Sequence, residues 1–123
     1  MERPQSEFPL MLEYKKHFEI TEKTIFALYP YIYTNYKLTP DLLVHESTHL
    51  KQQKNLGVDE WVNRYIDDID FRILQEIEAY KNQINSIKDR NQRERMKVWA
   101  SQTLSSSLYG SIINYQEAYI KLK

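Results

Sequence analysis

The 123-residue chain contains no cysteine. This absence excludes disulfide bonds, thiol catalysis and any metal site with cysteine ligands. A metal ion bound by this chain would therefore need histidine and carboxylate ligands. The absence of cysteine also fits a reducing compartment, and we expect the protein to be cytoplasmic.

Long apolar runs and a net charge are also absent. No apolar segment reaches the length of a membrane span, and residues 1–7 lack the apolar core of a secretory signal, so we expect a soluble protein without a membrane partner. Basic and acidic residues number 17 each, which gives no global attraction to nucleic acid. With two glycines and four prolines, the composition predicts one ordered domain over residues 1–123.

The pentapeptide His45-Glu46-Ser47-Thr48-His49 has the H-E-x-x-H pattern of a zinc site built on one helix. Residues four apart lie on one face of a helix, so His45 and His49 can direct imidazole nitrogens at one metal ion. Glu46 projects about 100° around the helix, where its carboxylate can take a proton from water at the metal. The alternative is a chance coincidence on an ordinary helix.

The flanking residues predict that this helix spans residues 40–56. Thr39 suits the N-cap, Pro40 the first helical position and Asp41 the positive end of the helix dipole. Gly57 is a typical residue at which a helix ends. The spacing of the two histidines on one face is therefore expected independently of the pentapeptide.

Strand character is confined to the residues before this helix. Residues 8–12 alternate, residues 18–20 form a shorter candidate, and residues 25–34 are rich in β-forming side chains on both faces. Pro30 suits an edge strand or a bulge. These segments predict a small antiparallel sheet that packs on the helix carrying His45 and His49.

Apolar periodicity predicts further helices over residues 58–66, 71–86, 90–109 and 111–122. Asp67, Asp68 and Asp70 are interpreted as helix caps, because the glycine and bidentate glutamate of an EF-hand are missing. The basic run over residues 88–97 is interpreted as a solvated face, with phosphate or nucleic-acid binding as the weaker alternative. The predicted fold class is α+β, with a helical C-terminal half.

A catalytic zinc ion normally has three protein ligands, and the residues after His49 contain no third histidine. A distant carboxylate is the natural candidate. Glu76 lies about 60° from the centre of the apolar stripe of its predicted helix, whereas Glu78 lies about 140° away. Glu76 is therefore the predicted third ligand. His17 would have to come from the strand region and is interpreted as a surface histidine.

His45-Glu46-x-x-His49, followed one helix later by Glu76-x-Glu78-Ala79, resembles the gluzincin metallopeptidases, in particular small, often phage-encoded, single-domain members. The resemblance covers residues 29–83. It implies a minimal zincin-like fold, a zinc ion bound by His45, His49 and Glu76, Glu46 as general base and acid, and a peptide or protein substrate. The chain departs from many gluzincins in having Tyr80 where they carry an aspartate or asparagine.

Two functions are expected from these residues. The first is zinc-dependent hydrolysis of peptide bonds. The second is a non-catalytic phage virion or assembly protein of the same fold, found in the virion or the host cytoplasm, because so short a chain leaves little to build a substrate cleft. The residue that stabilises an oxyanion is left open between four candidates, Tyr65, Tyr80, Arg64 and Arg72. Arg72 is alternatively an ion-pair partner of Glu76 one turn later.

Overall fold

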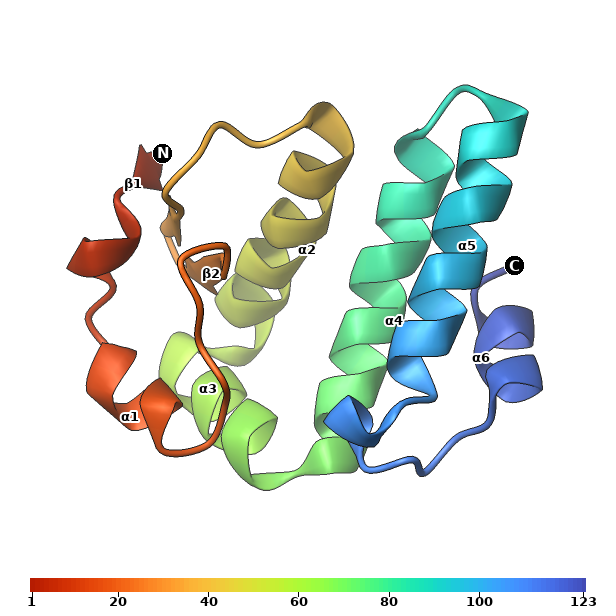
Figure 1. Cartoon of the computed structure of the whole chain (residues 1–123). Coiled ribbons are helices and arrows are strands. Elements are labelled where there is room, and N and C mark those ends of the chain that lie inside the picture. The colour runs from red at the N-terminus through yellow and green to blue at the C-terminus, as the bar shows by residue number, and fades with distance from the viewer.

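The computed structural model describes residues 1–123 and has the predicted α+β class, with six helices and a small sheet. Helix α2 lies at the centre, with the strands and α1 on one side and α4 and α5 on the other (Figure 1). In chain order the elements are β1 (Glu2–Arg3), the 3-10 turn η1 (Gln5–Glu7), α1 (Met11–Lys15), β2 (Phe26–Leu28), β3 (Tyr31–Tyr33), α2 (Pro40–Leu56), α3 (Val58–Asp67), α4 (Ile69–Ser86), α5 (Arg90–Leu104), the 3-10 turn η2 (Ser107–Tyr109) and α6 (Tyr115–Lys121).

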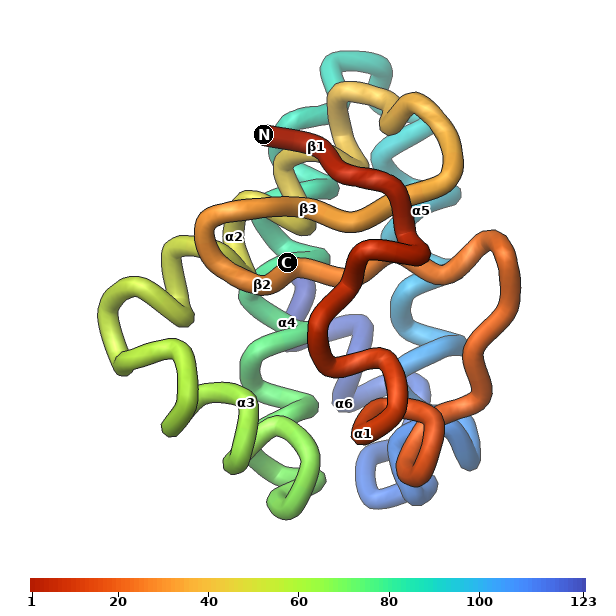
Figure 2. Tube along the Cα trace, turned by 90° about the vertical axis from the view of Figure 1, so that its left-hand side faces the viewer, coloured from red at the N-terminus to blue at the C-terminus, as the bar shows by residue number.

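The sheet is mixed, with β3 between β1 and β2 (Figure 2). β2 pairs with β3 in antiparallel orientation, with Phe26 opposite Tyr33. β1 pairs with β3 in parallel orientation, with Glu2 opposite Ile32. The prediction of an antiparallel sheet is therefore correct for the β2–β3 pair and wrong for β1.

β1 gave no side-chain signal because it consists of two exposed polar residues held through the main chain. The Ile32 amide donates to the Met1 carbonyl at 3.1 Å, and the Thr34 amide donates to the Arg3 carbonyl at 2.8 Å. Such pairing depends on backbone groups that every residue has. The sequence pattern therefore carried no information about it.

The strands predicted at residues 8–12 and 18–20 are absent, and these predictions are wrong. The first segment runs into helix α1 instead. Phe8 is buried, but Leu12 is 80% exposed, so the alternation of apolar residues does not mark one face of a strand. The alternation of apolar residues over so short a segment does not establish the two-residue period of a strand, and no partner strand pairs with it.

The strand predicted over residues 25–34 is a hairpin, with Tyr29 and Pro30 in its turn. Pro30 thus lies neither in an edge strand nor in a bulge. Gln53 of α2 binds the outer edge of β2. Its Oε1 accepts from the Tyr29 amide at 2.6 Å, and its Nε2 donates to the Ala27 carbonyl at 2.8 Å. These two bonds fix the hairpin on α2.

Helix α2 has the predicted bounds. Thr39 occupies the N-cap position, but its hydroxyl donates to Asp41 at 2.7 Å instead of capping the helix amides. The helix ends before Gly57, whose φ of 107° is rarely adopted by residues with a side chain. Because the helix is uninterrupted, His45 and His49 lie one turn apart on one face.

Helices α3 and α4 agree with the prediction to within a few residues, and the two C-terminal helices are shorter than predicted. Ser105 and Ser106 donate their hydroxyls to carbonyls of the preceding turn, which competes with continued helix, and α5 ends there. Asn114 and Glu117 form a capping box that starts α6. Asp68 caps α4, which confirms the capping interpretation for that aspartate.

The apolar core has two main parts, which lie on opposite sides of the α2–α4 pair. One joins α4, α5 and α6, and the other joins the sheet, α1 and α3. Their buried members include Ile73, Ile84, Ala100 and Leu104 in the first, and Phe8, Phe26 and Trp61 in the second. None of the helices combines the length and apolar character needed to cross a membrane.

Replacement of Gly57 by alanine should destabilise the protein by about 1–3 kcal/mol, because φ at this position is strongly unfavourable for a residue with a Cβ. Nothing lies within 4 Å of the added Cβ, so the loss comes from the backbone alone. Urea unfolding measures it, with Asn55→Ala on the exposed end of α2 as a control that changes stability by less than about 0.5 kcal/mol. An unchanged free energy for Gly57→Ala would contradict the assigned helix end.

Candidate metal centre

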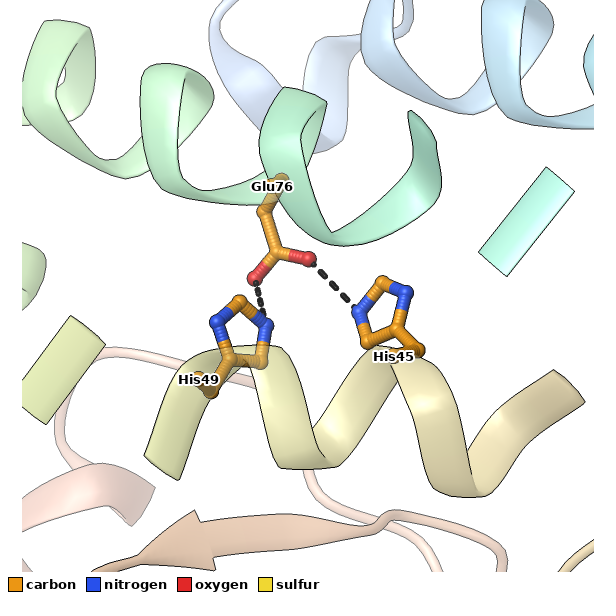
Figure 3. Close-up of side chains that lie close together, drawn as sticks. All are labelled: His45, His49 and Glu76. Carbon is orange, nitrogen blue, oxygen red and sulfur yellow. Dashed lines mark hydrogen bonds and ion pairs between the residues drawn. The ribbon is translucent and has the colours of Figure 1, made fainter. Parts of the chain in front are cut away.

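The structure brings the three predicted ligand residues together where α2 faces α4 (Figure 3). His45 and His49 project from α2, and Glu76 projects from α4 between them. His45 Nε2 lies 3.1 Å from Glu76 Oε1, and His49 Nε2 lies 3.1 Å from Glu76 Oε2. One potential ligand atom from each residue lies within 4.8 Å of the other two.

The group is buried and enclosed by aromatic side chains. His45, His49 and Glu76 are each between 5% and 6% exposed. The Tyr80 ring packs edge-on against His45, at 4.6 Å between ring centroids. The Tyr65 hydroxyl donates to Glu76 Oε2 at 2.6 Å. Bulk water is thus largely excluded, which strengthens electrostatic interactions among these groups.

Each histidine also has a partner at its other ring nitrogen that the sequence reasoning did not identify. His45 Nδ1 lies 2.9 Å from Gln83 Oε1, and His49 Nδ1 lies 2.9 Å from Gln52 Oε1. Gln52 follows His49 by three residues, so helix spacing could have suggested it. Gln83 lies on α4, and only the tertiary packing of α4 on α2 brings it to His45.

The charges of the three ligand residues are strongly coupled. Burial alone would raise the pKa of Glu76, but the two histidines outweigh it and hold that pKa well below its usual range. Burial alone would lower the pKa of His49, but Glu76 outweighs it and raises that pKa to about 9. The Glu76 carboxylate is therefore ionised and attracts positive charge to the space between the imidazoles.

The donor set fits a cation. In a neutral imidazole only one nitrogen carries a proton, yet both nitrogens of His45 and of His49 face oxygen acceptors. An extra proton on each ring, or one metal ion shared with Glu76, satisfies these contacts. Two histidine nitrogens and a carboxylate oxygen are a common ligand set for divalent transition metals. The His45–His49–Glu76 group could therefore hold a metal ion.

A cavity of about 160 Å³ opens onto this group from the side of β2. Glu46 lines it together with the three ligand residues. Burial raises the pKa of Glu46, and the two histidines oppose that shift only in part. The hydrogen bonds of the ligand group do not involve Glu46, so its carboxylate is available to a molecule in the cavity. The remaining lining residues are Tyr14, Ile25, Phe26, Ala27, Trp61 and Tyr65.

Most of the other sequence candidates have different roles. Arg72 donates to the carbonyls of Tyr65 and Ile66, and the alternative of an ion pair with Glu76 is not formed. Arg64 pairs with Glu60 at the surface, at 3.3 Å. Of the four candidates for oxyanion stabilisation, Tyr65 alone lines the cavity.

Glu78 and His17, the two other residues considered as metal ligands, lie outside the His45–His49–Glu76 group. Glu78 accepts a hydrogen bond from Gln52 at 2.7 Å and does not face the histidine Nε2 atoms. His17 lies 3.4 Å from Glu13 and is partly exposed. The prediction from helix periodicity that Glu76 faces the buried side of α4 and Glu78 faces solvent is therefore confirmed.

No protein-family model, curated protein or solved structure matches this chain. The resemblance to the gluzincins accordingly stays a prediction from the residues that carry it.

If the group holds a divalent metal ion such as zinc, replacement of Glu76 by alanine should weaken binding of that ion by at least about 100-fold, because it removes the only anionic member of the ligand group. Zinc content after dialysis, together with competition against a chromogenic chelator, measures the change. Glu60→Ala removes a surface carboxylate of α3 and serves as the control, with binding unchanged. Equal affinity in both variants would place the metal elsewhere in the protein.

The metal-free protein should lose stability as the pH rises from about 6.5 to 9. The raised pKa of His49, about 9 against 6.5 when unfolded, stabilises the fold fully below pH 6.5, and this contribution of about 3 kcal/mol is lost as pH passes 9. The depressed pKa of Glu76 acts at the acid side, where its contribution is lost as pH falls below about 4.5. Urea unfolding in the presence of chelator should therefore give a maximum between about pH 4.5 and 6.5.

The variant His49→Asn tests this assignment because it removes the titrating ring. Its free energy of unfolding should vary less between pH 6.5 and 9 than that of the unmodified protein. A stability that stays constant or rises over this range in the unmodified protein would contradict the coupling between His49 and Glu76.

Proposed function

We propose that the protein is a minimal zinc-dependent peptidase. The observation that supports this most directly is Glu46, a buried carboxylate that shares one cavity with His45, His49 and Glu76. These three residues would hold the zinc ion. When bound, zinc supplies a Lewis acid that polarises a carbonyl and lowers the pKa of a coordinated water to about 7.

Glu46 would act as the general base and acid. It has no partner in any of the chain's ion pairs, and burial raises its pKa toward the range in which a carboxylate can both take and return a proton. It would take a proton from the attacking water and give it to the departing amine. A buried carboxylate without an ion-pair partner lowers stability, so its presence favours a chemical role over a structural one.

Tyr65 would bind the carbonyl oxygen of the substrate by turning its single hydroxyl hydrogen from Glu76 to that oxygen. Tyr65 lines the cavity, and without substrate its hydroxyl donates to Glu76. Burial raises the pKa of Tyr65 well above the ordinary tyrosine value, so the group stays protonated and remains a hydrogen-bond donor. A donor of this kind is suited to a carbonyl oxygen on which negative charge develops.

The substrate class that the cavity favours is an extended or unfolded peptide. The cavity is small, and residues 25–27 of the hairpin form one of its walls. β2 is an edge strand, but Gln53 already binds the outward groups of Ala27 and Tyr29. A peptide that adds to this edge would therefore pair near Ile25, next to Glu46.

A second function, a non-catalytic protein with structural zinc, has two observations in its favour. The cavity of about 160 Å³ is smaller than the roughly 300–1,000 Å³ of typical ligand pockets. The ligand residues are also nearly inaccessible. A closed site of this kind suits a metal ion that joins α2 to α4 in an assembly or virion protein.

Replacement of Glu46 by glutamine should abolish peptidase activity, with a loss of at least about 100-fold, while zinc content stays near one per chain. It should also leave stability unchanged or increase it, because a charge that is costly to bury is removed. Turnover of a mixture of unstructured fluorogenic peptides, with and without chelator, measures the activity, and Glu60→Gln is the matched surface control.

The two functions give different results in this experiment. Chelator-sensitive turnover that Glu46→Gln removes supports the peptidase. Zinc-loaded protein without turnover supports the structural role, and turnover that survives in Glu46→Gln excludes Glu46 as the base.

A further inference from the structure

His45 is the first member of a chain of side chains that crosses from α2 to α4 and back. His45 Nδ1 lies 2.9 Å from Gln83 Oε1. Gln83 Nε2 in turn donates to Asp41 Oδ2 at 2.8 Å. Asp41 lies in the first turn of α2, where it also accepts the Thr39 hydroxyl. The imidazole is thus connected to a carboxylate through one glutamine amide.

His49 begins a second chain with the same chemistry. His49 Nδ1 lies 2.9 Å from Gln52 Oε1, and Gln52 Nε2 donates to Glu78 Oε1 at 2.7 Å. The same Nε2 also donates to the Gln75 carbonyl at 3.1 Å. Both histidines of the metal centre therefore contact a glutamine oxygen whose amide nitrogen is bound to a carboxylate.

The acceptors bound by the amide nitrogens of Gln83 and Gln52 determine how each amide group is oriented. An amide nitrogen donates and cannot accept, so it must point toward an acceptor. In Gln83 the acceptor is the Asp41 carboxylate. In Gln52 the acceptors are the Glu78 carboxylate and the Gln75 carbonyl. The amide oxygen of each glutamine is thereby directed at the imidazole. Because this oxygen only accepts, Nδ1 of each histidine must carry a proton.

We propose that Gln83 and Gln52 are positioning residues that set both histidines as the Nδ1–H tautomer, which leaves both Nε2 lone pairs for the metal ion. Asp41 and Glu78 fix the orientation of the two amides. This inference rests on the metal site of the proposed function. A ligand ring oriented before the metal arrives binds it more tightly than a ring that must first reorient.

The two chains differ in burial, and their effects should differ with it. Gln83 is 1% exposed, so no water can replace its oxygen at His45. The Gln52–Glu78 contact lies at the surface, where water can take over part of the role of Gln52. Loss of Gln83 should therefore weaken metal binding more than loss of Gln52.

Helix α2 also contains a buried glutamine, Gln53, whose role is purely structural. Gln53 is 0% exposed, like Gln83, and it binds only the backbone of the hairpin. Gln53→Leu therefore removes a buried amide without touching either histidine. It is the matched control for Gln83→Leu and Gln52→Leu.

The test combines zinc affinity with nuclear magnetic resonance of the histidine side chains. Zinc affinity, measured by chelator competition, should fall about 10- to 100-fold in Gln83→Leu and a few-fold in Gln52→Leu, with no change in Gln53→Leu. In the zinc-loaded protein, long-range proton–nitrogen spectra should show Nε2 bound to zinc and a slowly exchanging Nδ1–H on both rings. Fast exchange of the His45 Nδ1–H should appear in Gln83→Leu alone.

A rescue variant separates positioning from folding if Gln83→Leu does not fold. Gln83→Glu keeps an acceptor for His45 but brings a second carboxylate against Asp41, so zinc affinity should fall. Adding Asp41→Asn restores a donor behind the new carboxylate, and affinity should return to the original value or above it. Failure of the double variant to recover affinity, or equal losses in Gln83→Leu and Gln53→Leu, would overturn the proposal.

Failure of the proposed function has a different signature. If the chain binds no zinc, the metal site itself is refuted. If the chain binds zinc but hydrolyses no peptide, the peptidase is refuted, and the zinc affinities of Gln83→Leu and Gln53→Leu still test the positioning role.

Discussion

The Glu76 carboxylate, held between the Nε2 atoms of His45 and His49, is the contact on which the centre of this structure depends. Burial of an ionised carboxylate is costly unless positive charge compensates it, and here the compensation has to come from the two imidazoles or from a cation among them. That requirement couples α2 to α4, because the histidines lie on one helix and the glutamate on the other. It also explains why the pKa of Glu76 falls while that of His49 rises.

The rest of the fold keeps this contact dry and oriented. Helix α3 contributes Tyr65, whose hydroxyl binds Glu76 directly, and the hairpin closes the opposite side of the cavity. Glutamine side chains then perform three separate tasks on the same pair of helices. Gln83 and Gln52 hold the outer nitrogens of the histidines, and Gln53 holds the edge of β2. Amides suit all three positions because each can accept and donate at once without adding charge to a buried site.

Much of the centre could be predicted from the sequence, because it depends on helix geometry. Regular spacing places His45 and His49 on one face, and the same periodicity assigns Glu76 rather than Glu78 to the buried side of α4. The partners Gln83 and Gln52 were not predicted. Helix spacing could have suggested Gln52, three residues after His49, whereas Gln83 reaches His45 only through the packing of α4 on α2. The parallel strand β1 was missed for a related reason, because its pairing uses main-chain groups only. The prediction was correct for α2 and wrong for residues 8–12 because the two segments differ in length. A 17-residue helix with its own start and end signals is far less ambiguous than a five-residue apolar run.

We propose that His45, His49 and Glu76 bind one zinc ion through the two Nε2 atoms and a carboxylate oxygen. The most direct measurement is a crystal structure of the zinc-loaded protein with anomalous diffraction recorded at the zinc absorption edge. We predict one anomalous peak in the space between α2 and α4, about 2.0–2.2 Å from each of the three ligand atoms. An anomalous peak at another site would contradict this assignment. So would the absence of any peak while both histidines still donate hydrogen bonds to Glu76.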